Sequence, residues 1–145
     1  MVDSGPLSPV DVSTEVTLVL PDGSYESAAI RLVEDFADPL WVHWAGVVLS
    51  TSSLGDFHGW SWDFFEALRQ VRRDLDLLGA LVLVNGARVD AWPSGLQSSM
   101  HLARGVYLFA PQADQGQVRL LDPAEPSQVG TVAEQDSYCD ARTSR

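Results

Sequence analysis

Few residues of this chain have the types and spacing that catalysis requires. Ser94 lies in a Pro-Ser-Gly turn and lacks the Gly-x-Ser-x-Gly pattern that exposes a hydrolase nucleophile. Asp136 and Asp140 flank Cys139, and their negative charge disfavours a reactive thiolate. We therefore expect Ser94 to be a turn residue and Cys139 to be an unreactive surface thiol. The sequence predicts a non-enzymatic protein that carries no cofactor and no metal.

His58 is the histidine with carboxylates close to it in the sequence. Asp56 precedes it by two residues and Asp63 follows it by five, so these groups supply the residue types of a metal or acid–base site. Their spacing matches no His-x-x-x-His or Glu-x-x-His motif, and the sequence has no Gly-rich phosphate loop. A small-molecule- or metal-binding domain around His58, with or without enzymatic activity, is therefore the alternative hypothesis.

Aromatic residues are concentrated just before the most regular helical pattern. One nine-residue window contains Phe57, Trp60, Trp62, Phe64 and Phe65. These rings carry more apolar surface than one helix face can bury, so we expect some of them to be exposed. Exposed tryptophans beside Asp56 and Asp63 have the composition of a protein-binding hot spot, in which acids meet arginines of the partner. The competing interpretation is that the rings close the open end of a sheet.

Acidic residues are concentrated in the first half of the chain. The protein has a formal net charge of −11, and residues 1–68 hold 11 acids against Arg31 alone. Such a surface repels nucleic-acid phosphates, so we expect no direct nucleic-acid binding, and it attracts a basic protein. Trp92 alternates with Arg88 and Asp90 and is a second candidate for an exposed anchor.

The elements that must position these residues are predicted by apolar periodicity. Residues 16–20 and 28–32 alternate on either side of a Pro-Asp-Gly turn, which predicts a hairpin. Residues 41–50 are apolar at both alternations, which predicts a central strand covered on both faces. Residues 81–84 and 87–91 flank Asn-Gly, the favoured type I′ dipeptide, and predict a second hairpin. Residues 106–110 and 118–121 are predicted to form two strands on either side of a turn at Gly116. Residues 96–103 are predicted to form a short helix.

Two helices are predicted by their capping residues. Asp63 and Glu66 form an Asp version of a capping box, an apolar stripe follows at helical spacing, and Gly79 ends the segment. Thr131 and Glu134 form a second capping box for a short C-terminal helix. We therefore expect an α+β fold, with a mainly antiparallel sheet packed against one long helix.

The length and composition agree with one small domain. A chain of 145 residues with 46% hydrophobic residues can bury a core, and no apolar run reaches the roughly 18 to 20 residues of a membrane span. We expect a flexible lead-in over residues 1–13, the domain over residues 14–139 and a frayed tail over residues 140–145. Because no secretory signal is visible at the N-terminus, we expect a cytoplasmic protein without a membrane partner.

Five short segments are shared with a known group of proteins. They are Phe-Glu-Ala-Leu-Arg at 65–69, Asn-Gly-Ala-Arg at 85–88, Trp-Pro-Ser-Gly at 92–95, Val-Tyr-Leu at 106–108 and Thr-Val-Ala-Glu-Gln at 131–135. In this order they resemble small bacterial immunity-type proteins of polymorphic toxin systems, over about half the chain. Leu96 stands where that group usually has Met, and residues 100–104 replace a Gly-rich stretch. The resemblance implies a non-enzymatic inhibitor of a partner toxin.

These observations lead to one main hypothesis. The chain is expected to bind and neutralise a cognate, basic toxin or effector domain through an acidic and aromatic surface. A nuclease is one such toxin, because carboxylates can take the place of substrate phosphates. The residues predicted to contact the partner are Asp56, Phe57, Trp60, Asp63, Glu34, Asp35, Asp38 and Trp92. The sequence leaves the oligomeric state open, including the alternative that the chain is a subunit of an obligate assembly.

Overall fold

The computed structural model describes residues 12–35, 44–93, 103–108 and 117–143. Its strands are β1 Val12–Val19, β2 Tyr25–Asp35, β3 Trp44–Ser50, β4 Asp56–Ser61, β5 Leu81–Val82, β6 Ala91–Trp92, β7 Gly105–Leu108 and β8 Gln117–Arg119. The helices are α1 Phe64–Leu78 and α3 Val132–Thr143, with two 3₁₀ turns, η1 Asn85–Ala87 and η3 Pro126–Gln128. The predicted helix over 96–103, except residue 103, and the predicted turn at Gly116 lie outside these residues.

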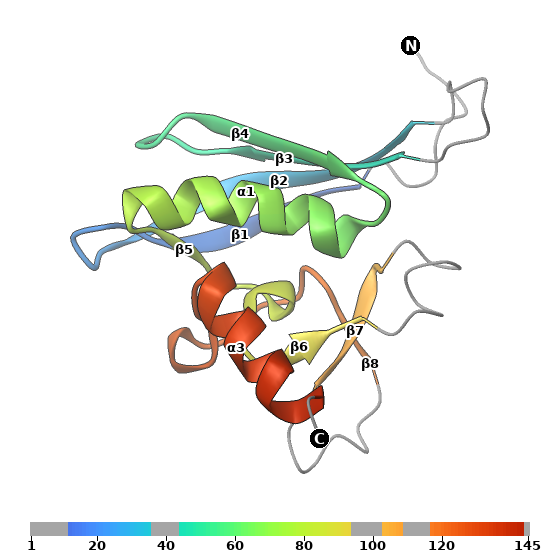
Figure 1. The fold of residues 1–145 in the computed structure, drawn as a ribbon. Coiled ribbons are helices and arrows are strands. Elements are labelled where there is room, and N and C mark those ends of the chain that lie inside the picture. The colour runs from blue at the N-terminus through green and yellow to red at the C-terminus, as the bar shows by residue number, and fades with distance from the viewer. Residues whose placement is uncertain (1–11, 36–43, 94–102, 109–116, 144–145) are drawn as a thin grey trace.

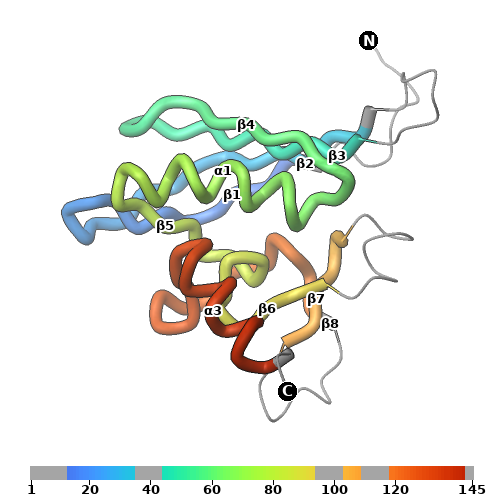
Figure 2. Tube along the Cα trace, in the orientation of Figure 1, coloured from blue at the N-terminus to red at the C-terminus, as the bar shows by residue number. Residues whose placement is uncertain are grey.

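The described strands form two antiparallel sheets. The larger has the order β4-β3-β2-β1-β5, and the smaller has the order β6-β7-β8. Helix α1 lies along one face of the large sheet (Figure 1). The Cα trace places α3 beside β6, beyond the β5 edge of the large sheet (Figure 2). The predicted α+β fold, with an antiparallel sheet on one long helix and a short C-terminal helix, is confirmed.

Helix α1 begins and ends where the sequence predicts. The side chain of Asp63 accepts a hydrogen bond from the backbone N–H of Glu66 at 2.7 Å, which satisfies a donor of the first turn. Gly79 ends the helix with φ +80°, a left-handed conformation that glycine adopts without strain. The apolar stripe packs against the sheet, and its buried members are Phe64, Leu68, Val71 and Leu75. Leu78, the last residue of the predicted stripe, is exposed.

The first hairpin is confirmed, and its strands are longer than the pattern predicts. Eight residue pairs join β1 to β2, from Val12 opposite Leu32 to Val19 opposite Tyr25. Inward residues of β2 and β3 are buried against α1, including Ile30, Val47 and Leu49. Strand β1 therefore starts inside the segment that we expected to be a lead-in.

Strand β3 is not the central strand, and one of its faces lies open. It stands between β2 and the edge strand β4, while β2 occupies the middle of the sheet. Its inward residues are buried, but Trp44 and Ser50 on the outward alternation are exposed. The continuous apolar pattern was misleading because the outward residue Gly46 is covered by the Trp60 ring of β4, and not by a second layer.

Strand β4 was not predicted from the sequence. Each of its two faces carries a single large apolar side chain, Phe57 on one and Trp60 on the other, and a glycine lies near its middle. Phe57, Gly59 and Ser61 face α1, whereas Asp56, His58 and Trp60 face outward. A Cβ on Gly59 would collide with the carbonyl oxygen of Ala67 in α1. Glycine therefore permits the close approach of helix and edge strand.

The predicted hairpin at Asn85-Gly86 is wrong. These residues form the 3₁₀ turn η1, and the following strand β6 pairs with β7 instead of β5. Gly86 is buried, and a Cβ there would lie 2.5 Å from a methyl carbon of Leu120. The packing of Gly86 under distant residues outweighs the local preference of Asn-Gly for a two-residue hairpin turn.

A buried polar network joins α1, η1 and α3. The Arg72 guanidinium donates to Gln135 Oε1 at 2.7 Å and to the Gly130 carbonyl at 3.0 Å. The Gln135 amide donates to the carbonyls of Gly86 at 3.0 Å and Arg88 at 2.8 Å. Burial lowers the pKa of Arg72 to about 10, so the side chain keeps its charge at neutral pH. These contacts lock the C-terminal helix to the rest of the fold.

The capping box of the C-terminal helix is confirmed. Glu134 N–H donates to Thr131 Oγ1 at 3.1 Å, and Thr131 N–H donates to Glu134 Oε1 at 2.8 Å. The helix continues to Thr143, beyond the point where we expected fraying. Cys139 is buried on this helix, so the expectation of a surface thiol is wrong.

The loop between β3 and β4 supplies a prediction about pH. Hydrogen bonds from the Ser53 side chain and from the backbone N–H groups of Ser53 and Ser52 lower the pKa of Glu26 below its ordinary value of 4.5. A carboxyl whose pKa is lower in the folded state stabilises the fold above its unfolded pKa, and this stabilisation is lost as the pH falls through the folded pKa. In acid denaturation from about pH 5 to about pH 3, the free energy of unfolding should fall more steeply in the wild type than in Glu26→Gln. Equal slopes would contradict this role.

Candidate functional site

Two acids of the predicted contact surface are buried and hold the fold together. Asp63 is 2% exposed and its carboxylate caps α1. The Glu34 side chain is also buried, and it forms an ion pair with Arg104, whose guanidinium lies over the Phe64 ring. Neither carboxylate is open to a partner's arginine, so we remove both residues from the predicted surface.

Trp92 is not the exposed anchor that its alternation suggested. It is half-buried, and its ring meets the Phe65 ring edge-on with centroids 5.2 Å apart. The Arg69 guanidinium lies 5.0 Å from the Trp92 ring centroid and forms an ion pair with Asp136 of α3. Trp92 therefore joins β6 to α1 within the fold.

The other predicted contact residues lie in β2 or β4, except Asp38, which follows β2 in the sequence. Asp35 ends β2, opposite Trp44 in the register of β3. Asp38 lies outside the described residues. Asp56 is exposed on the outward face of β4, whereas Phe57 is half-buried against the core. Trp60 is exposed on the same outward face as Asp56.

Three exposed tryptophans lie together at one end of the β3–β4 hairpin, and we call Trp44, Trp60 and Trp62 the tryptophan patch. Their exposed fractions are 39%, 39% and 63%. Trp60 pairs with Gly46, two residues from Trp44, and Trp62 follows the last residue of β4. Exposed large aromatic residues that are neighbours on one face are typical of binding surfaces.

The sequence identified Trp60 and Trp62 within the aromatic window but missed Trp44. Trp44 was assigned to a strand covered on both faces, and its exposure depends on β3 having an open outer face. Gly46 is a signal for the cross-strand ring of Trp60, and the sequence carries no comparable signal for Trp44. A Cβ on Gly46 would lie 2.7 Å from two ring carbons of Trp60.

Trp60 is held from two sides. Its ring covers Gly46, as the close approach to that residue requires. Its backbone is bracketed by the Gln70 side chain, which accepts from Trp60 N–H at 3.0 Å and donates to the Trp60 carbonyl at 2.8 Å. The amide of Gln70 thus takes the place of a neighbouring strand at this point of the sheet edge, and it leaves the ring outside as a preorganised anchor.

A row of four residues crosses the same outer face and has an acid at each end, and we call it the acidic row. Glu15, Ala29, Ser50 and Asp56 pair in sequence across β1, β2, β3 and β4. Glu15 and Asp56 are both exposed. Asp56 and Trp60 are four residues apart on one strand, which corresponds to about 13 Å. A partner surface of ordinary size, about 800 Å² on each side, is large enough to cover both the acids and the tryptophan patch.

The residues around His58 do not assemble a metal site. His58 and Asp56 share the outer face of β4, but Asp63 is directed to the N-terminus of α1. Within the ranges that the structure describes, no group of three or more His, Cys, Asp and Glu side chains is placed to hold a metal ion. The alternative hypothesis thus loses one of the three residues on which it rested.

Comparison with known proteins assigns no family to this chain. No family model matches the sequence, and no curated protein matches it either. Among the described helices, none is long and apolar enough to cross a membrane.

Adding a methyl group at Gly46 should displace Trp60. In Gly46→Ala the new Cβ meets the ring of a side chain that is already partly in solvent, so the ring can swing away. We expect the free energy of unfolding to change by less than about 1 kcal/mol, while the Trp60 indole resonance shifts toward that of a solvated ring. The matched control is Ser50→Ala on the same face of β3. An unmoved Trp60 resonance would contradict the proposed support of the ring.

Proposed function

We propose that this chain is an immunity protein that binds and neutralises a cognate toxin or effector domain of basic charge in the cytoplasm. The tryptophan patch is the observation that carries the proposal, because its three large, partly exposed side chains lose apolar exposure when a partner covers them. The acidic row on the same face and the net charge of −11 favour a basic partner.

The proposed surface differs from the one expected from the sequence. It keeps Asp56 and Trp60, gains Trp44 and Trp62, and loses Asp63, Glu34 and Trp92, whose side chains pack within the fold. Aromatic rings would supply most of the affinity, since tryptophans dominate measured hot spots. The acids would mainly accelerate association and orient the partner, so the association rate should fall as salt is added. No chemical step is needed for such a mechanism.

The test is a growth-rescue experiment. The open reading frame adjacent to the gene is induced in a bacterial host, with and without this chain, and growth is followed. We expect the adjacent product to arrest growth and this chain to relieve the arrest. The control is the same vector carrying a Trp60→Ala/Trp62→Ala variant whose folding has been verified by circular dichroism.

Two outcomes would contradict the proposal. One is arrest that this chain does not relieve, and the other is full relief by a variant without the patch. Metal analysis of the purified protein tests the alternative hypothesis of a metal-binding domain. A stoichiometric metal that disappears in His58→Ala would favour that hypothesis.

A further inference from the structure

Among the described residues, the first half of β1 has a neighbouring strand on one side only. Strand β5 pairs with Leu18 and Val19, and Leu83 N–H donates to the Thr17 carbonyl at 2.9 Å. Backbone groups of alternate residues point to the same side of a strand, so those of Ser13 and Glu15 point to the β5 side as Thr17 does. No described residue hydrogen-bonds to the backbone of Ser13 or Glu15 on that side. An edge of this kind can pair with another extended chain.

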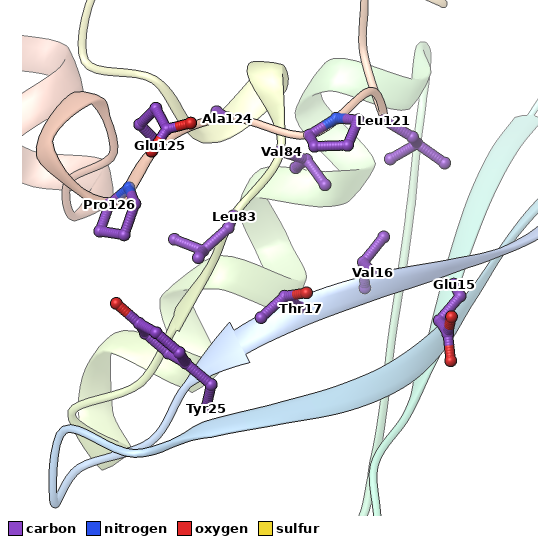
Figure 3. A pocket seen from close by; sticks show the side chains of 11 residues that line it. Glu15, Val16, Thr17, Tyr25, Leu83, Val84, Leu121, Ala124, Glu125 and Pro126 are labelled. Carbon is purple, nitrogen blue, oxygen red and sulfur yellow. The ribbon is translucent and has the colours of Figure 1, made fainter.

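A hollow of about 310 Å³ lies beside this edge (Figure 3). Glu15, Val16 and Thr17 of β1 form one side, and the segment from Leu121 to Pro126 forms the other, with Leu83 and Val84 between them. A second hollow of about 300 Å³ continues along β1 at Thr14 and shares Leu121. The edge is therefore bordered by a groove, and not by a flat surface.

The alternation of β1 predicts the pattern of a strand that could lie there. Val16 faces the core side, where Val84 and Leu121 line the hollow, so the added strand would direct apolar side chains inward. Glu15 faces the outer side and is exposed, so the residue opposite it would be a lysine or arginine. The segment that fits is one with alternating apolar and basic residues.

Charge distinguishes between the possible occupants. Glu15 and Glu125 line the first hollow, and no Lys or Arg lines it. Arg104, Arg119 and Asp122 line the second hollow, where Arg104 is paired with Glu34. The acidic end of the groove is therefore the first hollow. A second copy of this chain would bring a net charge of −11 to the same acids. We propose that the open edge of β1 receives an extended, alternately apolar and basic segment of another protein as an added strand. This edge is across the sheet from β4, so the proposal does not rest on the proposed function.

The test uses the whole isotope-labelled chain and a synthetic heptapeptide with blocked ends, Arg-Val-Arg-Val-Arg-Val-Arg. Amide shifts and hydrogen exchange are followed by NMR during titration. We expect saturable shifts over β1 and at Leu121, and at least about tenfold slower exchange of the Ser13 and Glu15 amides. A peptide with alternate backbone nitrogens methylated keeps the charge but cannot pair along the edge, and it should not slow this exchange. Glu15→Arg should weaken binding about fivefold or more, whereas Asp74→Arg on α1 should not.

Several results would overturn the proposal. They are the absence of shifts in β1 at millimolar peptide, equal binding of the methylated peptide, or equal binding of a peptide with Glu in place of Arg. Slow exchange of both amides before peptide is added would show that the edge is already paired. If that protection rose with protein concentration together with the particle size, a second copy would be the occupant.

Discussion

Replacing Trp60 and Trp62 together by alanine is expected to abolish neutralisation of the partner while the fold persists. Truncation of a tryptophan anchor in an interface costs about 2 to 4 kcal/mol of binding free energy, which lowers the affinity by about 30-fold or more. Trp62 is 63% exposed in the free protein, so its removal leaves no cavity in the core. Binding to the purified partner, measured by calorimetry, and growth rescue should fall together.

The matched control for this variant is Leu77→Ala. Leu77 is 86% exposed on α1 and is also a large apolar side chain, so its removal tests the general effect of surface hydrophobicity. We expect Leu77→Ala to bind as the wild type does. Trp60→Phe keeps a ring over Gly46 and should retain part of the affinity. Undiminished affinity in the double tryptophan variant would place the interface on another face of the molecule.

Replacing Gln135 by leucine is expected to cost about 3 to 5 kcal/mol of the free energy of unfolding. Gln135 is fully buried, and its amide joins Arg72 to the carbonyls of Gly86, Arg88 and Ala91. Leucine has a similar volume but accepts no hydrogen bond, so the buried guanidinium of Arg72 loses an acceptor. Urea denaturation followed by circular dichroism measures the loss, and the exposed Ser137→Ala on the same helix is the control.

The double variant Arg72→Leu/Gln135→Leu gives the sharper comparison. It removes the buried charge together with its acceptor, and replacing both partners is generally far less costly than breaking the pair. We expect the double variant to unfold at a higher urea concentration than Gln135→Leu alone. Additive losses from the two single variants would show that Arg72 and Gln135 do not depend on each other.

Local sequence patterns predicted correctly the features whose interacting residues lie close together in the sequence. The caps at Asp63, Gly79 and Thr131 were predicted correctly because each cap is formed within a few residues of chain. The β1–β2 hairpin was also predicted, since alternation and a Pro-Asp-Gly turn act over the same short distance.

Elements that depend on distant contacts were missed. Strand β4 exists because Gly59 fits against α1 and because β3 offers it a partner. Residues 85–87 form η1 because Gly86 packs under Leu120 and its carbonyl accepts from Gln135. Neither interaction produces a periodic pattern in the sequence near these residues, so no local pattern could predict strand β4 or the turn η1.

The sequence by itself determined the acidic charge, the number of aromatic rings, the α+β class and the limits of α1. Only the tertiary structure decided which of those acids and rings face solvent. Asp63 and Glu34 are buried in a cap and an ion pair, whereas Trp44 and Trp60 are each 39% exposed on the outer face of the sheet. The physical reason is that exposure depends on what the folded chain brings next to a side chain, and the neighbours that cover these residues, or fail to, come from other elements.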